Sequence, residues 1–142
     1  MKGLGISLLV CLMGGLWAVP GQAADKETPK GDTRIFEIRT YYPNPGKMEA
    51  LHARFRNHTC RLFKKHGIEI IGFWVPSDPE KAEQKLVYIV AFPSAEAAKK
   101  SWQSFLNDPV WKAAKAASEK DGVLVGKIES VYLKATDYSS IK

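Results

Sequence analysis

The stretch from Arg34 to Phe55, RIFEIRTYYPNPGKMEALHARF, decides the fold. Its first nine residues alternate in character, as expected of a β-strand with two unlike faces. The turn at 43–46 ends this strand, because its two prolines cannot donate ladder hydrogen bonds and its glycine frees the backbone. One strand face carries Phe36, Ile38 and Thr40, and the other carries Glu37, Arg39 and Tyr41.

The residues after the turn predict an amphipathic α-helix. Mostly apolar side chains recur every three or four positions, which lays them along one stripe of a helix. Gly67 follows the last of them and is a typical helix C-cap. The stripe consists of Met48, Leu51, Phe55, Thr59, Leu62 and His66.

Three more strands and a second helix are predicted beyond Gly67. The strands are residues 68–75, 86–92 and 127–134, each rich in aliphatic or aromatic side chains. Ser94 is predicted to cap the second helix, whose buried stripe includes Ala98, Trp102 and either Phe105 or Leu106. Asp108 and Pro109 interrupt this helix and start a further segment. The predicted apolar face of that segment consists of Val110, Ala113, Ala114 and Ala117.

The element order is β-α-β-β-α-β, which predicts the α+β class and a ferredoxin-like fold with a four-stranded antiparallel sheet. Two helices cover only one face of such a sheet, so the other face must meet water or a partner. The alternation is interpreted as placing the more uniformly apolar set beneath the helices: Phe36, Ile38, Ile71, Phe73, Val75, Val87, Ile89 and Ala91. The open face is then expected to show Glu37, Arg39, Tyr41, Ile70, Gly72, Trp74, Leu86, Tyr88 and Val90, with Ser130 and Tyr132.

An open face with this many aromatic and aliphatic side chains is too large an apolar patch for a soluble monomer. We therefore expect a homodimer that packs sheet against sheet through the open face, with a partly polar cavity between the subunits.

Several stretches resemble the NIPSNAP family: FEIRTYYPNPGKMEALHARFRNHT, FKKHGIEIIGFW, AAKKSW, NDPVW and ATDYS. The resemblance covers Arg34 to about Ser140. It implies membership of the dimeric α+β barrel group, and hence a dimeric α/β barrel, which agrees with the fold and the dimer expected from the residues. It implies no reaction and no catalytic residues, because the family is defined by sequence.

The N-terminus predicts export. Lys2 precedes an apolar run from Leu4 to Val19, and Pro20 and Gly21-Gln22-Ala23 supply a cleavage site after Ala23. The run is shorter than the roughly 20 residues that span a bilayer, so no stable membrane insertion is expected after cleavage. The predicted organisation is a signal peptide at 1–23, a disordered linker at 24–33 and one domain at 34–142, in a periplasmic or secreted protein.

Three side chains on one strand face, Glu37, Arg39 and Tyr41, are the first candidate ligand site. Arg39 would hold an anionic group and Glu37 would accept a proton, while the alternative is an ion cluster that fixes the dimer register. Trp74 and Tyr88 would wall the same pocket around a flat ligand, or simply pack in the interface.

Among the three histidines, His58 is the best candidate for a general base, although a structural hydrogen bond is the commoner role. His52, His58 and His66 lack the i, i+4 spacing of a helical metal site, so no metal is expected. His66 is expected to satisfy carbonyl groups at its helix end.

The remaining composition excludes several classes of function. The formal charge of +6 is modest, and no aromatic residues interleave with the basic ones, so nucleic acid is not an expected partner. No glycine-rich phosphate loop or GxSxG elbow occurs. After cleavage Cys60 is the single cysteine, so no internal disulfide is expected.

The sequence therefore predicts a binding or interaction module without catalysis and without a cofactor, whose ligand is small and partly apolar or anionic. The alternative, by analogy of fold, is a cofactor-independent monooxygenase or a haem-degrading enzyme that uses the cavity between subunits.

Overall fold

The computed structural model describes residues 34–142, so the predicted signal peptide and linker lie outside the described residues. Its elements, in chain order, are β1 (Ile35–Pro43), α1 (Met48–Arg54), the π-helix η1 (Phe55–Thr59), α2 (Cys60–Lys65), β2 (Glu69–Trp74), the 3-10 helix η2 (Pro79–Lys81), β3 (Leu86–Phe92), α3 (Ala95–Asn107), α4 (Pro109–Ser118) and β4 (Val125–Lys134).

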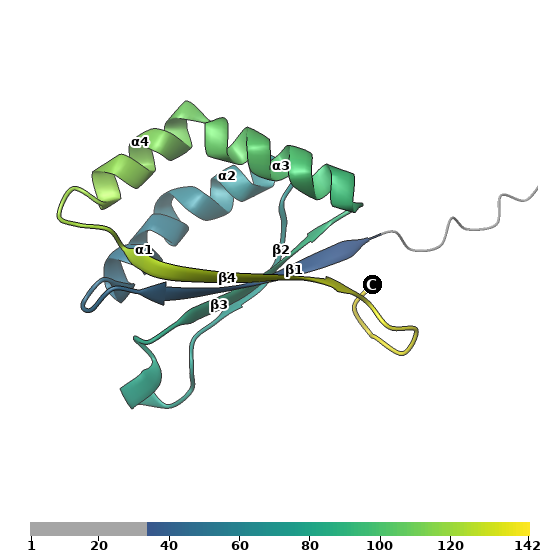
Figure 1. The fold of residues 1–142 in the computed structure, drawn as a ribbon, viewed down its shortest axis with the longest axis horizontal. Helices are drawn as coiled ribbons and strands as arrows, with labels where there is room; N and C mark the ends of the chain where they lie inside the picture. The colour runs from purple at the N-terminus through teal and green to yellow at the C-terminus, as the bar shows by residue number, and fades with distance from the viewer. Residues whose placement is uncertain (1–33) are drawn as a thin grey trace, which may run out of the picture.

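The four strands form one antiparallel sheet in the order β2-β3-β1-β4. All the α-helices lie on one face of this sheet, and Figure 1 shows them above it. The β2–β3 connection, which contains η2, and the C-terminal segment project from the opposite face (Figure 1). The predicted α+β class and the ferredoxin-like arrangement are confirmed.

The predicted assignment of strand faces is wrong for the central strands, and also for Ser130 and Tyr132 of β4, which lie on the helical side. Glu37 and Tyr88 are fully buried beneath the helices, where Tyr88 packs against Phe55 and Phe63. The residues of β1 and β3 that face the helices are Glu37, Arg39, Tyr41, Leu86, Tyr88, Val90 and Phe92. The open face instead carries Phe36, Ile38, Val87, Ile89 and Ala91, together with Val131 and Leu133 of β4.

This reversal has a physical cause. Alternation fixes which residues share a face, but apolar residues suit both a helix-covered core and a face that awaits a partner. In β1, Trp102 of α3 provides a donor for Glu37, so the polar face lies inside.

β2 contains a second departure from simple alternation. Its register against β3 shifts between Ile70 and Gly72, and such a bulge changes which face the following residues occupy. Ile70 and Phe73 both pack against the core, although one was predicted on each face. Trp74 and Gly72 lie on the open face as predicted, with the Trp74 ring directly over Gly72.

The predicted first helix is present with a π turn in its middle. Its stripe is buried from Met48 to Leu62, and Thr59 Oγ donates to the Arg54 carbonyl at 3.2 Å across the wider turn. Gly67 ends the helix with a φ of 70°, as predicted.

The second helix begins and divides where the sequence predicts. Ser94 Oγ accepts from the Ala97 amide, and Asp108 Oδ1 accepts from the Val110 amide at the start of α4. The predicted apolar face of α4 is wrong except at Ala114. Val110, Ala113 and Ala117 are exposed, because the Trp111 ring turns inward and stacks 4.5 Å from Phe105.

Candidate functional site

A buried carboxylate forms the centre of the polar cluster beneath the helices. Glu37 is 1% exposed, and alternation along β1 points it toward α3. Its Oε1 accepts from Arg39 Nη1 and from Ser130 Oγ, both at 2.5 Å, and its Oε2 accepts from Trp102 Nε1 at 2.6 Å. Donors from β1, β4 and α3 thus satisfy one ionised group, which is the condition for burying it.

Arg39 is the cation of this cluster. Its guanidinium lies 4.7 Å from the centre of the Trp102 ring and 5.6 Å from that of Tyr41. Burial opposes the charged form, but the oxygens of Tyr88, Tyr41 and Glu37 outweigh it and raise the pKa of Arg39 above its ordinary value. Its buried Nε has no hydrogen-bond partner within residues 34–142, so the arginine keeps one donor for an additional acceptor.

Two tyrosines extend the cluster toward the aromatic core. Tyr88 Oη donates to Tyr41 Oη at 3.0 Å, and the two rings meet edge to face at 5.2 Å. Burial raises the pKa of Tyr88 well above its ordinary value. The Tyr88 phenol therefore stays neutral at physiological pH and acts as a hydrogen-bonding group.

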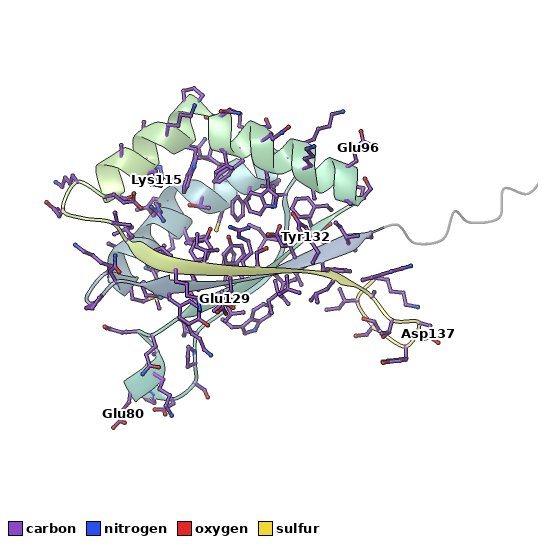
Figure 2. The ribbon with its side chains drawn as sticks, in the orientation of Figure 1. Glu80, Glu96, Lys115, Glu129, Tyr132 and Asp137 are labelled. Atoms are coloured by element: carbon purple, nitrogen blue, oxygen red, sulfur yellow. The ribbon has the colours of Figure 1, made fainter. Side chains whose placement is uncertain are left out.

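Tyr132 connects the cluster to solvent. It lies opposite Glu37 in the β1–β4 register, on the side of β4 that faces α3, and is 53% exposed (Figure 2). Burial of its inner part and the Glu37 carboxylate raise its pKa. One edge of Tyr132 thus lies by the buried ion pair while the other meets water.

A groove of about 500 Å³, lined in part by Tyr132, lies between α3 and β4. This volume is within the range of small-molecule sites. Its floor is mostly apolar, and two lysines stand on opposite walls, one from α3 and one from β4. Neither lysine forms an ion pair with a carboxylate in the part of the chain that the structure describes. The lining residues are Ile35, Ala95, Lys99, Tyr132, Leu133 and Lys134.

The structure brings together four of the six predicted site residues, but on the opposite face from the one predicted. Glu37, Arg39 and Tyr41 adjoin Tyr88 beneath the helices, whereas Trp74 lies on the open face and does not wall their pocket. The cavity between two open sheets that the sequence was interpreted to form is therefore not where these polar groups lie.

His58 is not part of the cluster. It is half-buried in the π-helix η1, and within residues 34–142 no hydrogen bond or ion pair joins it to Glu37 or Arg39. Its predicted role as a base has no support from this geometry.

Two features of the site were missed from the sequence. Trp102 was predicted only as part of a helix stripe, although a buried indole N–H needs an acceptor and the nearest strand offered Glu37. Lys99 and Lys134 carry no local signal, because the groove exists only once α3 crosses β4.

No group of three or more His, Cys, Asp or Glu side chains within residues 34–142 is arranged to hold a metal ion. No helix of this range is long and apolar enough to cross a bilayer. Cys60 is a half-buried free thiol, and burial raises its pKa, which disfavours the reactive thiolate.

The strand order and the one-sided helical layer define a ferredoxin-like α+β domain with a polar cluster between sheet and helices. A family model described as NIPSNAP matches residues 36–140. The chain belongs to the NIPSNAP family.

Solved structures agree with this assignment. An uncharacterized NIPSNAP-like domain protein from Burkholderia xenovorans has a TM-score of 0.66 at 15% identity, covering 76% of this chain and 90% of that one. A NIPSNAP family protein of unknown function from Agrobacterium tumefaciens has a TM-score of 0.67 at 21% identity, covering 79% and 96%. The comparison with curated proteins gives no match.

SnoaB, a cofactor-independent oxygenase from Streptomyces nogalater, is more distant. The solved structure, which is that of a mutant, has a TM-score of 0.51 at 13% identity, covering 78% of this chain and 99% of that one. At these identities the likeness shows the fold alone.

Proposed function

We propose that the protein is an exported homodimer whose subunits each bind a small anionic molecule with a flat apolar body in the groove between α3 and β4. The observation that carries this proposal is the pairing of an apolar floor with two lysines that have no carboxylate partner within residues 34–142. A carboxylate or sulfonate would lie between Lys99 and Lys134, since opposite charges at short range are favoured. The apolar body would then lie against Ile35 and Ala95.

Tyr132 gives the groove its selectivity, because it presents a phenol among the lining residues. The charges of Glu37 and Arg39 both act on this phenol from the buried cluster. A ligand with a second oxygen acceptor would bind more tightly than one without it, because the Tyr132 hydroxyl can donate to that acceptor.

The homodimer is proposed from the open face. Its exposed side chains include Trp74, Val131 and Leu133, and Phe36, Ile38, Val87 and Ile89 lie beside them. The β2–β3 connection and the C-terminal segment project at opposite ends of this face (Figure 1). Mostly apolar side chains line the surface beside each of them. A second copy offers the same surface, and two apolar sheet faces pack about 10 Å apart.

Export is proposed from the apolar run and the cleavage site after Ala23. Intact-mass measurement of protein recovered from the exporting host should give a chain that begins at Ala24, and a retained Met1 would refute processing.

Ligand binding is tested with 8-anilinonaphthalene-1-sulfonate, a fluorescent anion with a flat apolar body. We expect saturable binding near one probe per chain, weakened about tenfold in Lys99→Gln/Lys134→Gln, which corresponds to about 1.4 kcal/mol. Lys100→Gln is the matched control, because Lys100 is also exposed on α3 but does not line the groove. Equal affinity in the double variant and the control would overturn the groove assignment.

A second candidate function is a cofactor-independent oxygenase. It is favoured by the likeness to SnoaB and by the Trp102 and Tyr41 rings beside Arg39, which would hold a flat substrate. A haem-degrading enzyme is the related case, tested by adding haem and following its Soret band. Binding followed by bleaching with reductant favours the enzyme, whereas an unchanged spectrum counts against it.

A further inference from the structure

A second polar cluster, separate from the groove, joins Ser104, His66 and Asp108. His66 follows α2, Ser104 lies on α3, and Asp108 lies at the junction of α3 and α4. Ser104 Oγ is 2.7 Å from His66 Nδ1, and Asp108 Oδ2 is 2.7 Å from His66 Nε2. Contrary to the expectation for a helix end, the His66 ring contacts two side chains rather than terminal carbonyls.

The direction of each hydrogen bond follows from the charge of Asp108. Hydrogen bonds from Lys65 and His66 hold the pKa of Asp108 well below its ordinary value, so this group is a carboxylate that only accepts. Nε2 of His66 must therefore carry the proton that points to Asp108. In the neutral imidazole Nδ1 is then an acceptor, and the Ser104 hydroxyl must donate to it.

The three groups differ in exposure in a way that suits chemistry at the serine. The side chain of Asp108 is 1% exposed and that of His66 is 10% exposed, whereas Ser104 is open to solvent. Asp108 is also fixed by the Val110 amide at 2.7 Å and by Lys65 Nζ at 2.7 Å. A buried carboxylate thus orients a histidine whose free nitrogen faces an accessible hydroxyl.

We propose that Ser104 is an activated nucleophile, with His66 as its general base and Asp108 as the group that orients the base, and that it takes acyl groups from small activated esters. Serine, histidine and aspartate play these parts on unrelated folds, where they are recognised by geometry rather than by sequence motif. This explains how such a site exists without the GxSxG elbow. It is independent of the proposed groove.

The reaction is a hydrolysis in two steps. Ser104 Oγ bonds to the ester carbonyl carbon, its proton passes to His66 Nδ1, and the bond to the alcohol oxygen breaks as that oxygen takes the proton from His66. Water then attacks the acyl-serine, giving its proton to His66 and releasing the carboxylic acid as Ser104 recovers its hydrogen. The contacts of the cluster include no pair of backbone donors for a developing oxyanion, so we expect slow turnover of activated esters and none of amides.

A serine-directed fluorophosphonate probe tests the proposal without requiring turnover. The Ser104 oxygen bonds to phosphorus, fluoride leaves, and the serine proton goes to His66. We expect one adduct per chain, mapped to Ser104 by peptide mass spectrometry. Ser104→Ala should abolish it, while Ser101→Ala, the matched control one helical turn earlier, should label like the unmodified chain.

His66→Gln and Asp108→Asn test whether Ser104 is activated by its neighbours or is labelled only because it is exposed. A positioned base contributes about 100-fold or more to such a step, so His66→Gln should slow labelling by that order. Asn at 108 still caps α4 but lacks the charge, and we expect labelling to slow at least tenfold. Circular dichroism confirms that each variant is folded before its rate is compared. An adduct at another serine, or equal rates in folded His66→Gln and the unmodified chain, would overturn the proposal.

Discussion

The two faces of the sheet are opposite in character to what burial by the helices alone would suggest. The helix-covered face holds an ion pair, two phenols and the Ser130 hydroxyl, while the uncovered face holds Phe36, Ile38, Ile89 and Val131. The covered face can hold these polar groups because hydrogen bonds from three elements satisfy almost all of them. The uncovered face is apolar because, in our proposal, it is covered by a second copy.

The largest expected effect comes from breaking the covered face at its centre. Glu37→Ala leaves the Arg39 charge and the Trp102 N–H without their acceptor beneath α3. Removing one partner of a buried ion pair costs about 3–5 kcal/mol, so the free energy of unfolding measured with urea should fall by that amount.

Glu129→Gln is the control for that variant on the other face. Glu129 pairs with Lys127 at 2.6 Å at an exposed position of β4, where ion pairs contribute little (Figure 2). Its urea midpoint should be almost unchanged. Equal losses in the two variants would mean that the covered cluster has no special role in stability.

A smaller loss of stability is expected at low pH, when Asp108 on the helical side of the sheet is protonated. The pKa of Asp108 is lowered in the folded state, so its contribution to stability is present above its ordinary value of about 3.8 and is lost as the pH falls below it. Asp108→Asn should flatten this part of the profile of urea midpoint against pH. If the urea midpoint of the variant falls at low pH as steeply as that of the unmodified chain, other carboxylates are responsible for the loss of stability.

The smallest effect is expected at Tyr132, which lines the groove. Tyr132→Phe removes a hydroxyl from a half-exposed ring, so stability should barely change. Affinity for 8-anilinonaphthalene-1-sulfonate should fall about fivefold, the value of one hydrogen bond of about 1 kcal/mol. Unchanged affinity in a fluorescence titration would exclude the phenol from the site.

These two faces also show how far the sequence predicts the molecule. Alternation in β1 correctly groups Glu37, Arg39 and Tyr41, because side-chain direction along a strand is local. Which group lies beneath the helices is not local, since it depends on the donor that Trp102 brings from a residue 65 positions away. The bulge near Ile71 is equally invisible, because it appears only in the pairing with β3.

The candidate site divides in the same way. The sequence identifies its strand residues but assigns them to the wrong face of the sheet. It also groups Trp74 with them, although Trp74 lies on the other face. The groove lysines were not identified, because an exposed lysine on α3 has no sequence feature that distinguishes it from its neighbours. The grouping of side chains along one strand is thus predictable here, while the face of the sheet that they occupy is set by packing.

The most direct test of the account compares two adjacent residues of β4 that are almost equally exposed. Val131 is 54% exposed on the open face, and Tyr132 is 53% exposed on the helical side. Size-exclusion chromatography with light scattering should give a dimer for the unmodified chain and for Tyr132→Asp. It should give a folded monomer for Val131→Asp, because dimerisation would bury the new charge without a partner. A monomeric unmodified chain, or a Val131→Asp variant that stays dimeric, would contradict the account.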